Sequence, residues 1–394
     1  MGDKILPFET LRGLMALWVF FYHTASILLL HQPNQEFENL LLRLPSGTQA
    51  VKVFIILSGF VIFLVLANKQ EGYFTYMHKR FFRIYPLFFI TLTAATLLGP
   101  WLFQGFAPLW LQNQPSDTIL NRSINAFYKP ESYRAVCYFL QITMLSGLVP
   151  NVLMQGAAQA LLSPTWSILL EWQFYLVAPI LFAGMYGKPG HRGSLAAFLT
   201  IFAAWLFFRY YNPWGFGTAF LPVMFNYFLV GMFSYKLYAY LREKEFRIGW
   251  PLASVLLLLV ATITKDPVFI VWTAFFLMIF FKCDNLLERG LVAVMSWRPL
   301  VYLGAISYSI YLWHLGLVYL IIYALGVVYA ETPSLSPLFM LGWVMGIGTP
   351  LVLAMSALSY HFIEQPFIRL GSRLRRRAPS LEASEPTQSP TSSS

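Results

Sequence analysis

An arginine and a histidine, Arg12 and His23, stand inside the first apolar run of the chain, residues 5–30. In a helix, the step of eleven positions from Arg12 to His23 leaves both side chains within about 20° of one face and roughly 16 Å apart along the axis. A histidine so deep in a membrane-spanning helix is costly to bury, which makes His23 a candidate functional residue. The alternative is a structural histidine that bonds to a neighbouring helix.

Basic side chains gather in the segment MHKRFFRIYP, residues 77–86. Arg80 and Arg83 are three residues apart, so they share a helix face, and Lys79 adds to the basic surface. Guanidinium groups hold phosphate oxygens in a bidentate geometry, so this pattern predicts that the segment binds the phosphates of a substrate. The alternative is an ordinary anchor at the cytoplasmic surface. Pro86 is expected to begin the next span.

Glu171 is the lone carboxylate in the aromatic-rich run SPTWSILLEWQFYLVAP, residues 163–179. A carboxylate in a membrane must pair, become protonated or face water. We expect its partner to be Arg12, His23 or His314. Paired with His23, it would orient the imidazole and raise its basicity, and a structural ion pair is the alternative.

Polar side chains also recur in YLGAISYSIYLWHLG, residues 302–316, where Ser307 and His314 are seven residues apart on one helix face. Tyr308 and His314 are therefore candidate substrate-binding residues, although such groups also join helices by hydrogen bonds. The small pair in SGF, residues 58–60, predicts a close helix approach, and Ser58 is a further candidate for substrate binding.

The elements that must position these residues follow from composition. Hydrophobic residues make up 58% of the 394 and charged residues only 11%, which is typical of a polytopic helical membrane protein. The net charge of +10 does not indicate nucleic-acid binding, because most basic residues lie in short segments between apolar runs, as cytoplasmic loops require. Two cysteines, Cys137 and Cys283, give neither a disulfide framework nor a metal site.

Eleven apolar runs can be read along the chain, and the basic segments decide how many of them cross. All five basic segments become cytoplasmic if the polar, interrupted run 135–154 does not cross fully. We therefore predict an all-α fold with about ten transmembrane helices and both termini cytoplasmic. Residues 104–165 would be non-cytoplasmic, residues 1–370 would form the membrane domain, and residues 371–394 would be a basic and then disordered cytoplasmic tail.

Six motifs in order resemble those of acyltransferase family three, integral-membrane enzymes that acylate sugars, lipids and antibiotics. They are LRGLMALWVFFYH, FIILSGF, KRFFRIYP, TWSILLEWQFYL, ISYSIYLWH and YHFIEQP, between about residues 5 and 370. The resemblance implies that His23 is catalytic, with Arg12 on the same helix and with Arg80 and Arg83 near the phosphates of a donor. Many relatives carry an acid where this chain has Lys52.

The expected function is transfer of an acyl group, acetyl above all, from cytoplasmic acyl-CoA to a hydroxyl of a carbohydrate, glycolipid or other lipid-linked acceptor. His23 would act as general base, the alternative being that it carries the acyl group covalently, and no tightly bound cofactor or metal is expected. The chain is expected to be a multi-pass protein of a bacterial cytoplasmic (inner) membrane, in contact with membrane lipid. The alternative is a transporter for an anionic solute, with Arg12 and His23 lining the pathway, although no inverted repeat is evident.

Overall fold

The computed structural model describes residues 5–31, 35–69, 71–104, 129–186, 192–329 and 337–373. Regular structure in these ranges is helical, apart from one isolated β-bridge between Ile248 and Phe281, which confirms the predicted all-α class. The longer helices are α1 (Leu6–His31), α3 (Gly47–Asn68), α4 (Tyr73–Gln104), α8 (Thr165–Tyr186), α9 (Arg192–Tyr210), α10 (Leu221–Glu243), α11 (Trp250–Thr264), α15 (Ser307–Tyr329) and α16 (Pro337–Ser359). The shorter ones are α2 (Gln35–Leu42), α7 (Glu131–Ile142), α12 (Pro267–Met278), α13 (Leu286–Met295), α14 (Arg298–Ala305) and α17 (Gln365–Arg373).

Six helical segments in the described ranges are long and apolar enough to cross a membrane. They lie in α1, α3, α4, α8, α15 and the continuous stretch from α16 into α17. Residues 195–210 of α9, together with α11 and α12, are apolar but shorter. The chain is therefore an integral membrane protein, while the number of ten crossings stays a prediction. The tail after residue 373, the first four residues and the segment 105–128 lie outside the described residues.

Two expectations about single runs can be compared with the structure. The run 135–154 is not one helix, because α7 ends at Ile142 and a short 3-10 turn, Ser146–Leu148, follows it. A break is what its polar and Pro-containing sequence predicts. Pro86, in contrast, does not begin a span, because α4 runs through it from Tyr73 to Gln104. The basic motif and the apolar run after it are thus one helix.

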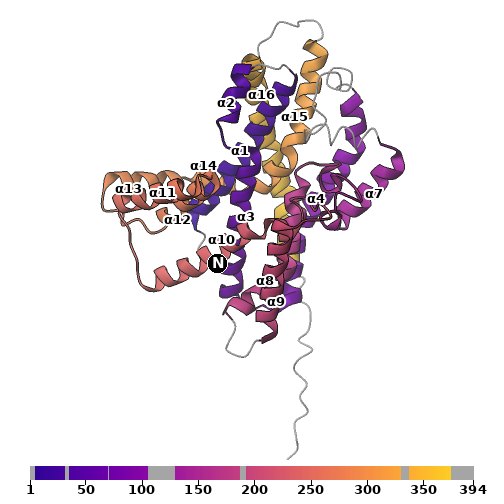
Figure 1. The fold of residues 1–394 in the computed structure, drawn as a ribbon. Coiled ribbons are helices and arrows are strands. Elements are labelled where there is room, and N and C mark those ends of the chain that lie inside the picture. Colours follow the sequence, from indigo (N-terminus) through magenta and orange to yellow (C-terminus); the bar gives the residue numbers. More distant parts are fainter. Residues whose placement is uncertain are drawn as a thin grey trace, which may run out of the picture.

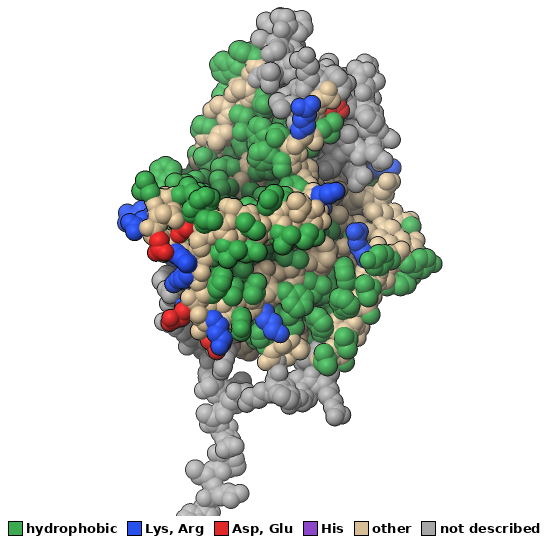
Figure 2. All heavy atoms as spheres, turned by 60° about the vertical axis from the view of Figure 1, so that its left-hand side comes forward, with side chains coloured by type: hydrophobic (Ala, Val, Ile, Leu, Met, Phe, Trp, Pro, Cys, Tyr) green, Lys and Arg blue, Asp and Glu red, His purple; other side chains and the backbone are tan. Residues whose placement is uncertain are grey.

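Hydrophobic side chains cover much of the surface. On the face shown in Figure 2 they extend over most of the height of the molecule, while the acidic side chains in view lie mainly toward one side. Leu97 of α4 and Ile263 of α11 are exposed to 73% and 72% of their area. Apolar groups exposed on this scale suit a surface that faces lipid rather than water.

Glycines bring the helices of the core into close contact. A Cβ atom added to Gly59 of α3 would lie 2.6 Å from the carbonyl oxygen of Phe228 in α10, and one on Gly231 would overlap the carbonyl oxygen of Ile56. The close approach predicted from the SGF sequence is thus confirmed. Gly304 of α14 has the same function at the crossing with α1, where a Cβ would overlap the carbonyl oxygen of Glu9.

The helices that carry the candidate residues form one upright group, in which α1 packs against both α3 and α15 and α3 packs against α8 (Figure 1). The helices α11 and α13 extend to one side of this group in the same view. Buried aromatic rings fill the centre. Phe60 of α3, for example, makes edge contacts with Phe8 at 4.9 Å and with Tyr238 at 5.4 Å between ring centroids.

Candidate active site

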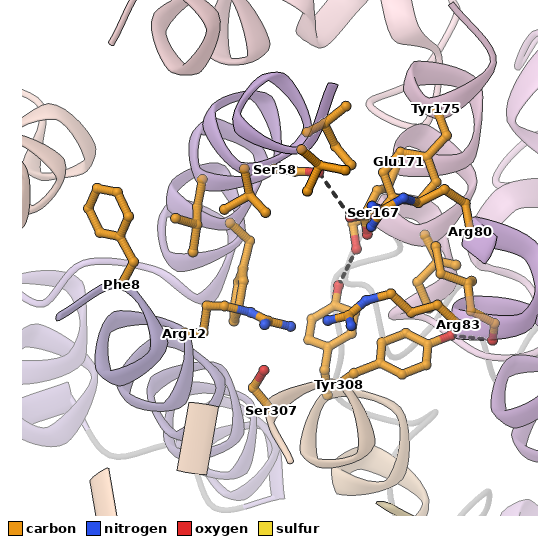
Figure 3. A pocket seen from close by; sticks show the side chains of 18 of the residues that line it. Phe8, Arg12, Ser58, Arg80, Arg83, Ser167, Glu171, Tyr175, Ser307 and Tyr308 are labelled. Carbon is orange, nitrogen blue, oxygen red and sulfur yellow. Dashed lines mark hydrogen bonds between the residues drawn. The ribbon is translucent and has the colours of Figure 1, made fainter. Parts of the chain in front are cut away.

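A cavity of about 420 Å³ lies where five of these helices meet. Its polar lining comes from α1, α3, α4, α8 and α15, together with Lys69 at the end of α3. Figure 3 shows the guanidinium groups of Arg12 and Arg83 reaching into this cavity from opposite sides. The first helix and the basic motif of α4 therefore serve one site, although 71 residues separate Arg12 from Arg83. 

Positive charge exceeds negative charge in the lining. The cationic lining residues are Arg12, Lys69, Arg80 and Arg83, whereas the carboxylates are Glu9 and Glu171. An apolar environment strengthens the interaction of such groups with any ion that enters. The excess of cations makes this cavity suited to an anionic ligand, phosphate groups above all.

Arg80 is held by aromatic rings. Its guanidinium carbon lies 5.5 Å from the ring centroid of Tyr76 and 5.6 Å from that of Tyr175, both in cation–π range. Its Nε atom is buried and has no hydrogen-bond partner among the described residues. The guanidinium group is thus oriented without its donor capacity being used up, as a ligand-binding group requires.

Glu171 is bonded to neutral hydroxyl groups. Ser58 donates a hydrogen bond of 2.9 Å to its Oε1, and the Tyr175 hydroxyl donates to the same oxygen (Figure 3 shows the first of these). The expected pairing of Glu171 with a histidine or with Arg12 is not formed. The reason is geometric, because α8 presents this residue to the cavity between α3 and α4 rather than to the histidines. Glu171 therefore does not contact His23 in this structure, although both Glu171 and Ser58 line the cavity, and a catalytic role for Glu171 stays a prediction.

The two membrane histidines bond to each other. Nδ1 of His23 lies 2.9 Å from Nε2 of His314, and their rings are nearly parallel, at 11°. Nδ1 of His314 lies 2.7 Å from the carbonyl oxygen of Tyr311, one turn earlier in α15. His314 is fully buried, so the expectation that it contacts substrate is replaced by a contact with His23.

Tyr311 joins the histidine pair to the cavity. Its carbonyl group bonds to His314, while the residue also lines the cavity. Its hydroxyl lies 2.8 Å from Oγ of Ser167 and donates to the carbonyl oxygen of Pro164. The cavity and the histidine pair are thus neighbours, with Tyr311 between them.

Of the remaining predicted site residues, Tyr308 lines the cavity and Lys79 does not. Tyr308 lines the cavity, and its hydroxyl donates 2.7 Å to the carbonyl oxygen of Ile84. Lys79 does not belong to the lining, because its ammonium group is paired with Glu71. Lys79 points away from the cavity that Arg80 lines, since neighbouring positions of a helix face about 100° apart, and its binding of substrate stays a prediction.

Sequence reasoning missed several lining residues, notably Ser167, Tyr175 and Lys69. A signal for two of them was present, because Ser167, Glu171 and Tyr175 are spaced four residues apart and share one face of α8. For Lys69, an ordinary anchoring lysine after a span would look the same. Among the described residues, no group of three or more His, Cys, Asp or Glu side chains is placed to hold a metal ion.

The sequence was also compared with families of known proteins. Residues 7–361 match the family described as an acyltransferase domain, family three. The chain belongs to acyltransferase family three. No curated protein and no solved structure has significant similarity to this acyltransferase. Membership confirms the resemblance drawn from the motifs and makes the chain a membrane acyltransferase.

Proposed function

We propose that this acyltransferase moves an acyl group, acetyl in particular, from cytoplasmic acyl-CoA to a hydroxyl of a carbohydrate or a lipid-linked acceptor. The observation that carries the proposal is the cavity lined by Arg12, Arg80 and Arg83 that adjoins the pair formed by His23 and His314. Its natural setting would be the cytoplasmic membrane of a bacterium. Coenzyme A acts as the leaving group of a substrate, and no tightly bound cofactor is required.

The arginines would hold the charged end of the donor. Phosphate groups fit guanidinium forks, and Arg80 already has a free buried Nε. The uncharged pantetheine arm could then extend past the apolar lining, such as Phe54 and Val51, toward His23. Charge would remain with the arginines while a neutral thioester reaches the base.

His23 would be the general base. It takes the proton of the acceptor hydroxyl as the hydroxyl oxygen attacks the thioester carbon, forming a C–O bond. The C–S bond then breaks, and the thiolate of coenzyme A leaves with the proton that His23 accepted. The products are an ester and free coenzyme A, and the histidine returns to its neutral form.

The test uses His23→Gln, which keeps a polar side chain but cannot accept a proton. The purified variant should bind coenzyme A like the wild type, because the arginines are unchanged. Transfer of labelled acetyl groups to lipid and glycan extracts should fall by about 10²–10⁴, the usual contribution of a general base. His361→Gln is a matched control, because His361 is exposed and contacts Tyr302 outside the cavity.

A folded, donor-binding His23→Gln protein that transfers at near-normal rate would overturn the catalytic assignment. Measurements on the wild-type protein alone distinguish an acyltransferase from a transporter. An acyltransferase releases coenzyme A from acetyl-CoA when acceptor is present, whereas a transporter of anions leaves the thioester intact. Mass spectrometry of surface glycans and lipids, with and without the gene, would identify the acceptor.

A further inference from the structure

We propose that His314 is a positioning residue that fixes the tautomer of His23 and leaves Nε2 of His23 as the basic nitrogen. This inference rests on the proposed function of His23. It assigns to His314 a contact with the base rather than with either substrate. Three observations carry it: a carbonyl group at one end of the chain of hydrogen bonds, the burial of the pair, and the surroundings of the free nitrogen.

The direction of the hydrogen bonds follows from the carbonyl oxygen of Tyr311, which can only accept. Nδ1 of His314 lies 2.7 Å from it and must therefore carry the proton. In a neutral imidazole the other nitrogen, Nε2, then has a lone pair and accepts. Nδ1 of His23, 2.9 Å away, must donate to it. Nε2 of His23 is consequently left as an acceptor, ready to take a proton.

Burial disfavours the alternative protonation state, in which both ring nitrogens of His314 carry a proton. Its side chain has no exposed area, and its partners among the described residues are His23 and backbone carbonyl groups, not a carboxylate. An unpaired charge at such a place is strongly disfavoured. Two neutral rings, each with one proton on Nδ1, satisfy all the contacts of the pair.

The free nitrogen faces a position without a side chain. A Cβ atom added to Gly47, the first residue of α3, would lie 3.3 Å from Nε2 of His23. Glycine at this position therefore places no side chain of its own beside Nε2. The start of α3 is fixed by a capping box, in which Ser46 and Gln49 exchange hydrogen bonds, so the free side is a defined part of the fold.

The hydrogen bond between His23 and His314 also explains how His23 can hold a proton during the reaction. When Nε2 of His23 takes the proton of the acceptor hydroxyl, the ring becomes positive. The bond from its Nδ1–H to Nε2 of His314 becomes stronger, because a charged donor forms the stronger hydrogen bond. The proton then leaves from Nε2 to the thiolate of coenzyme A, and His314 gains and loses none.

The experiment compares His314→Gln with His314→Phe. Glutamine can place an amide oxygen near the position of Nε2 and accept from His23, whereas phenylalanine keeps the ring shape and has no acceptor. We expect kcat to fall by about 10²–10⁴ in His314→Phe, as when a triad histidine loses its orienting partner, and to recover to within about tenfold in His314→Gln. The KM for acetyl-CoA should change in neither variant.

A purely structural role predicts the reverse order, with phenylalanine close to the wild type and glutamine impaired, and that result would overturn the proposal. Nitrogen NMR of the wild-type protein with labelled histidine gives a second readout that does not depend on activity. The His23 signal, assigned by its loss in His23→Gln, should show a protonated Nδ1 and a bare Nε2. A proton on Nε2 would also overturn it.

The two proposals can fail separately. A wild-type protein with the expected tautomer and no acyl transfer would end the proposed function and leave the tautomer assignment in place. A wild-type protein that transfers acyl groups, with His314→Phe as active as the wild type, would end the role of His314 and leave the acyltransferase chemistry intact.

Discussion

The basic residues of the KRFFR sequence differ in what each can offer a ligand. Arg80 stands between two aromatic rings with a buried nitrogen still free, and Arg83 reaches into the cavity opposite Arg12 (Figure 3). Lys79, their neighbour in the sequence, is paired with Glu71 away from the cavity lining. One short motif therefore contains both cations that line the cavity and one that does not.

This difference gives a matched pair of variants for donor binding. The double change of Arg80 and Arg83 to alanine should weaken coenzyme A binding by tenfold or more per residue, because each charge-assisted hydrogen bond contributes about 1.5–3 kcal/mol. Lys79→Ala should change the dissociation constant by about twofold or less, since a partly exposed ion pair contributes little. Titration calorimetry in detergent measures both. Equal losses in the two proteins would mean that overall charge, not the cavity, attracts the donor.

At the scale of helices, the contact between α3 and α10 depends on having no side chain at Gly231. Gly231→Ala should lower the free energy of unfolding by about 1–3 kcal/mol, because the new methyl group meets the backbone of α3 at Ile56. Transfer should fall as well, since Ser58 of α3 bonds to Glu171 in the cavity. Thermal unfolding in detergent measures the first effect.

A glycine in open space provides the control for that change. Gly346 of α16 is exposed, and a Cβ there would have nothing within 4 Å. Gly346→Ala should leave stability unchanged or raise it slightly, because alanine favours a helix by about 1 kcal/mol over glycine. If both alanine variants unfold alike, the close approach of α3 and α10 is not what limits stability.

The lateral helices α11 and α13 are joined by one buried carboxylate, Glu288. Its two oxygens accept backbone N–H bonds of 2.8 Å from Trp250, at the start of α11, and from Cys283. These bonds, that of Trp250 first, hold the pKa of Glu288 below its ordinary value of 4.5. Ionised Glu288 thus fixes the ends of two helices.

The lowered pKa of Glu288 predicts how the stability of the protein depends on pH. A lowered pKa in the folded state adds stability that is complete above pH 4.5, the ordinary value, and is lost as the pH falls toward the lowered one. Glu288→Gln should therefore unfold at a lower temperature than the wild type at pH 7, and the difference should shrink below pH 4.5. Unfolding curves of both proteins between pH 3 and 7 test it. A constant difference would assign the effect to packing.

Much of the helical frame was predictable, whereas the partners of single polar groups were not. Long apolar runs and the small pair at Ser58 and Gly59 indicate helices and a close crossing directly. The partner of Glu171, however, depends on the rotation of α8 about its axis and on which helices adjoin it. The contact between His23 and His314 joins residues 291 positions apart, and no local spacing shows such a contact.

At the scale of the whole molecule, the distribution of basic residues predicts one topology, with ten crossings and both termini cytoplasmic. With both termini cytoplasmic, Lys69 and Arg80 lie near the cytoplasm, where acyl-CoA is found, and Val152 lies in the segment expected on the other side. Cysteine labelling of intact cells tests this in a Cys137→Ser, Cys283→Ser background. Val152→Cys should react with an impermeant maleimide from outside, because its side chain is exposed.

Gly72→Cys is the opposite probe. It lies between α3 and α4, where a Cβ has nothing within 4 Å, and it should react only after the membrane is opened. If Gly72→Cys is labelled in intact cells and Val152→Cys is not, the orientation is reversed. If both react from one side, the number of crossings between them differs from that in the ten-span topology.

The position of Tyr311 has a consequence for how well the membrane retains a proton gradient. On the proposed topology, donor and acceptor approach from opposite faces, so their common path is also a route by which protons could leak. Tyr311 is bonded to Ser167, its ring centroid is 6.3 Å from that of Phe54, and it lies between the cavity and the histidines, so we expect it to slow the passage of protons along that route. Proteoliposomes that contain Tyr311→Ala should therefore lose an imposed pH gradient faster than those with the wild type, as a trapped dye would record. Equal rates would mean that Tyr311 does not limit the passage of protons. Faster loss of the gradient in the variant would mean that Tyr311 helps the membrane to retain its proton-motive force.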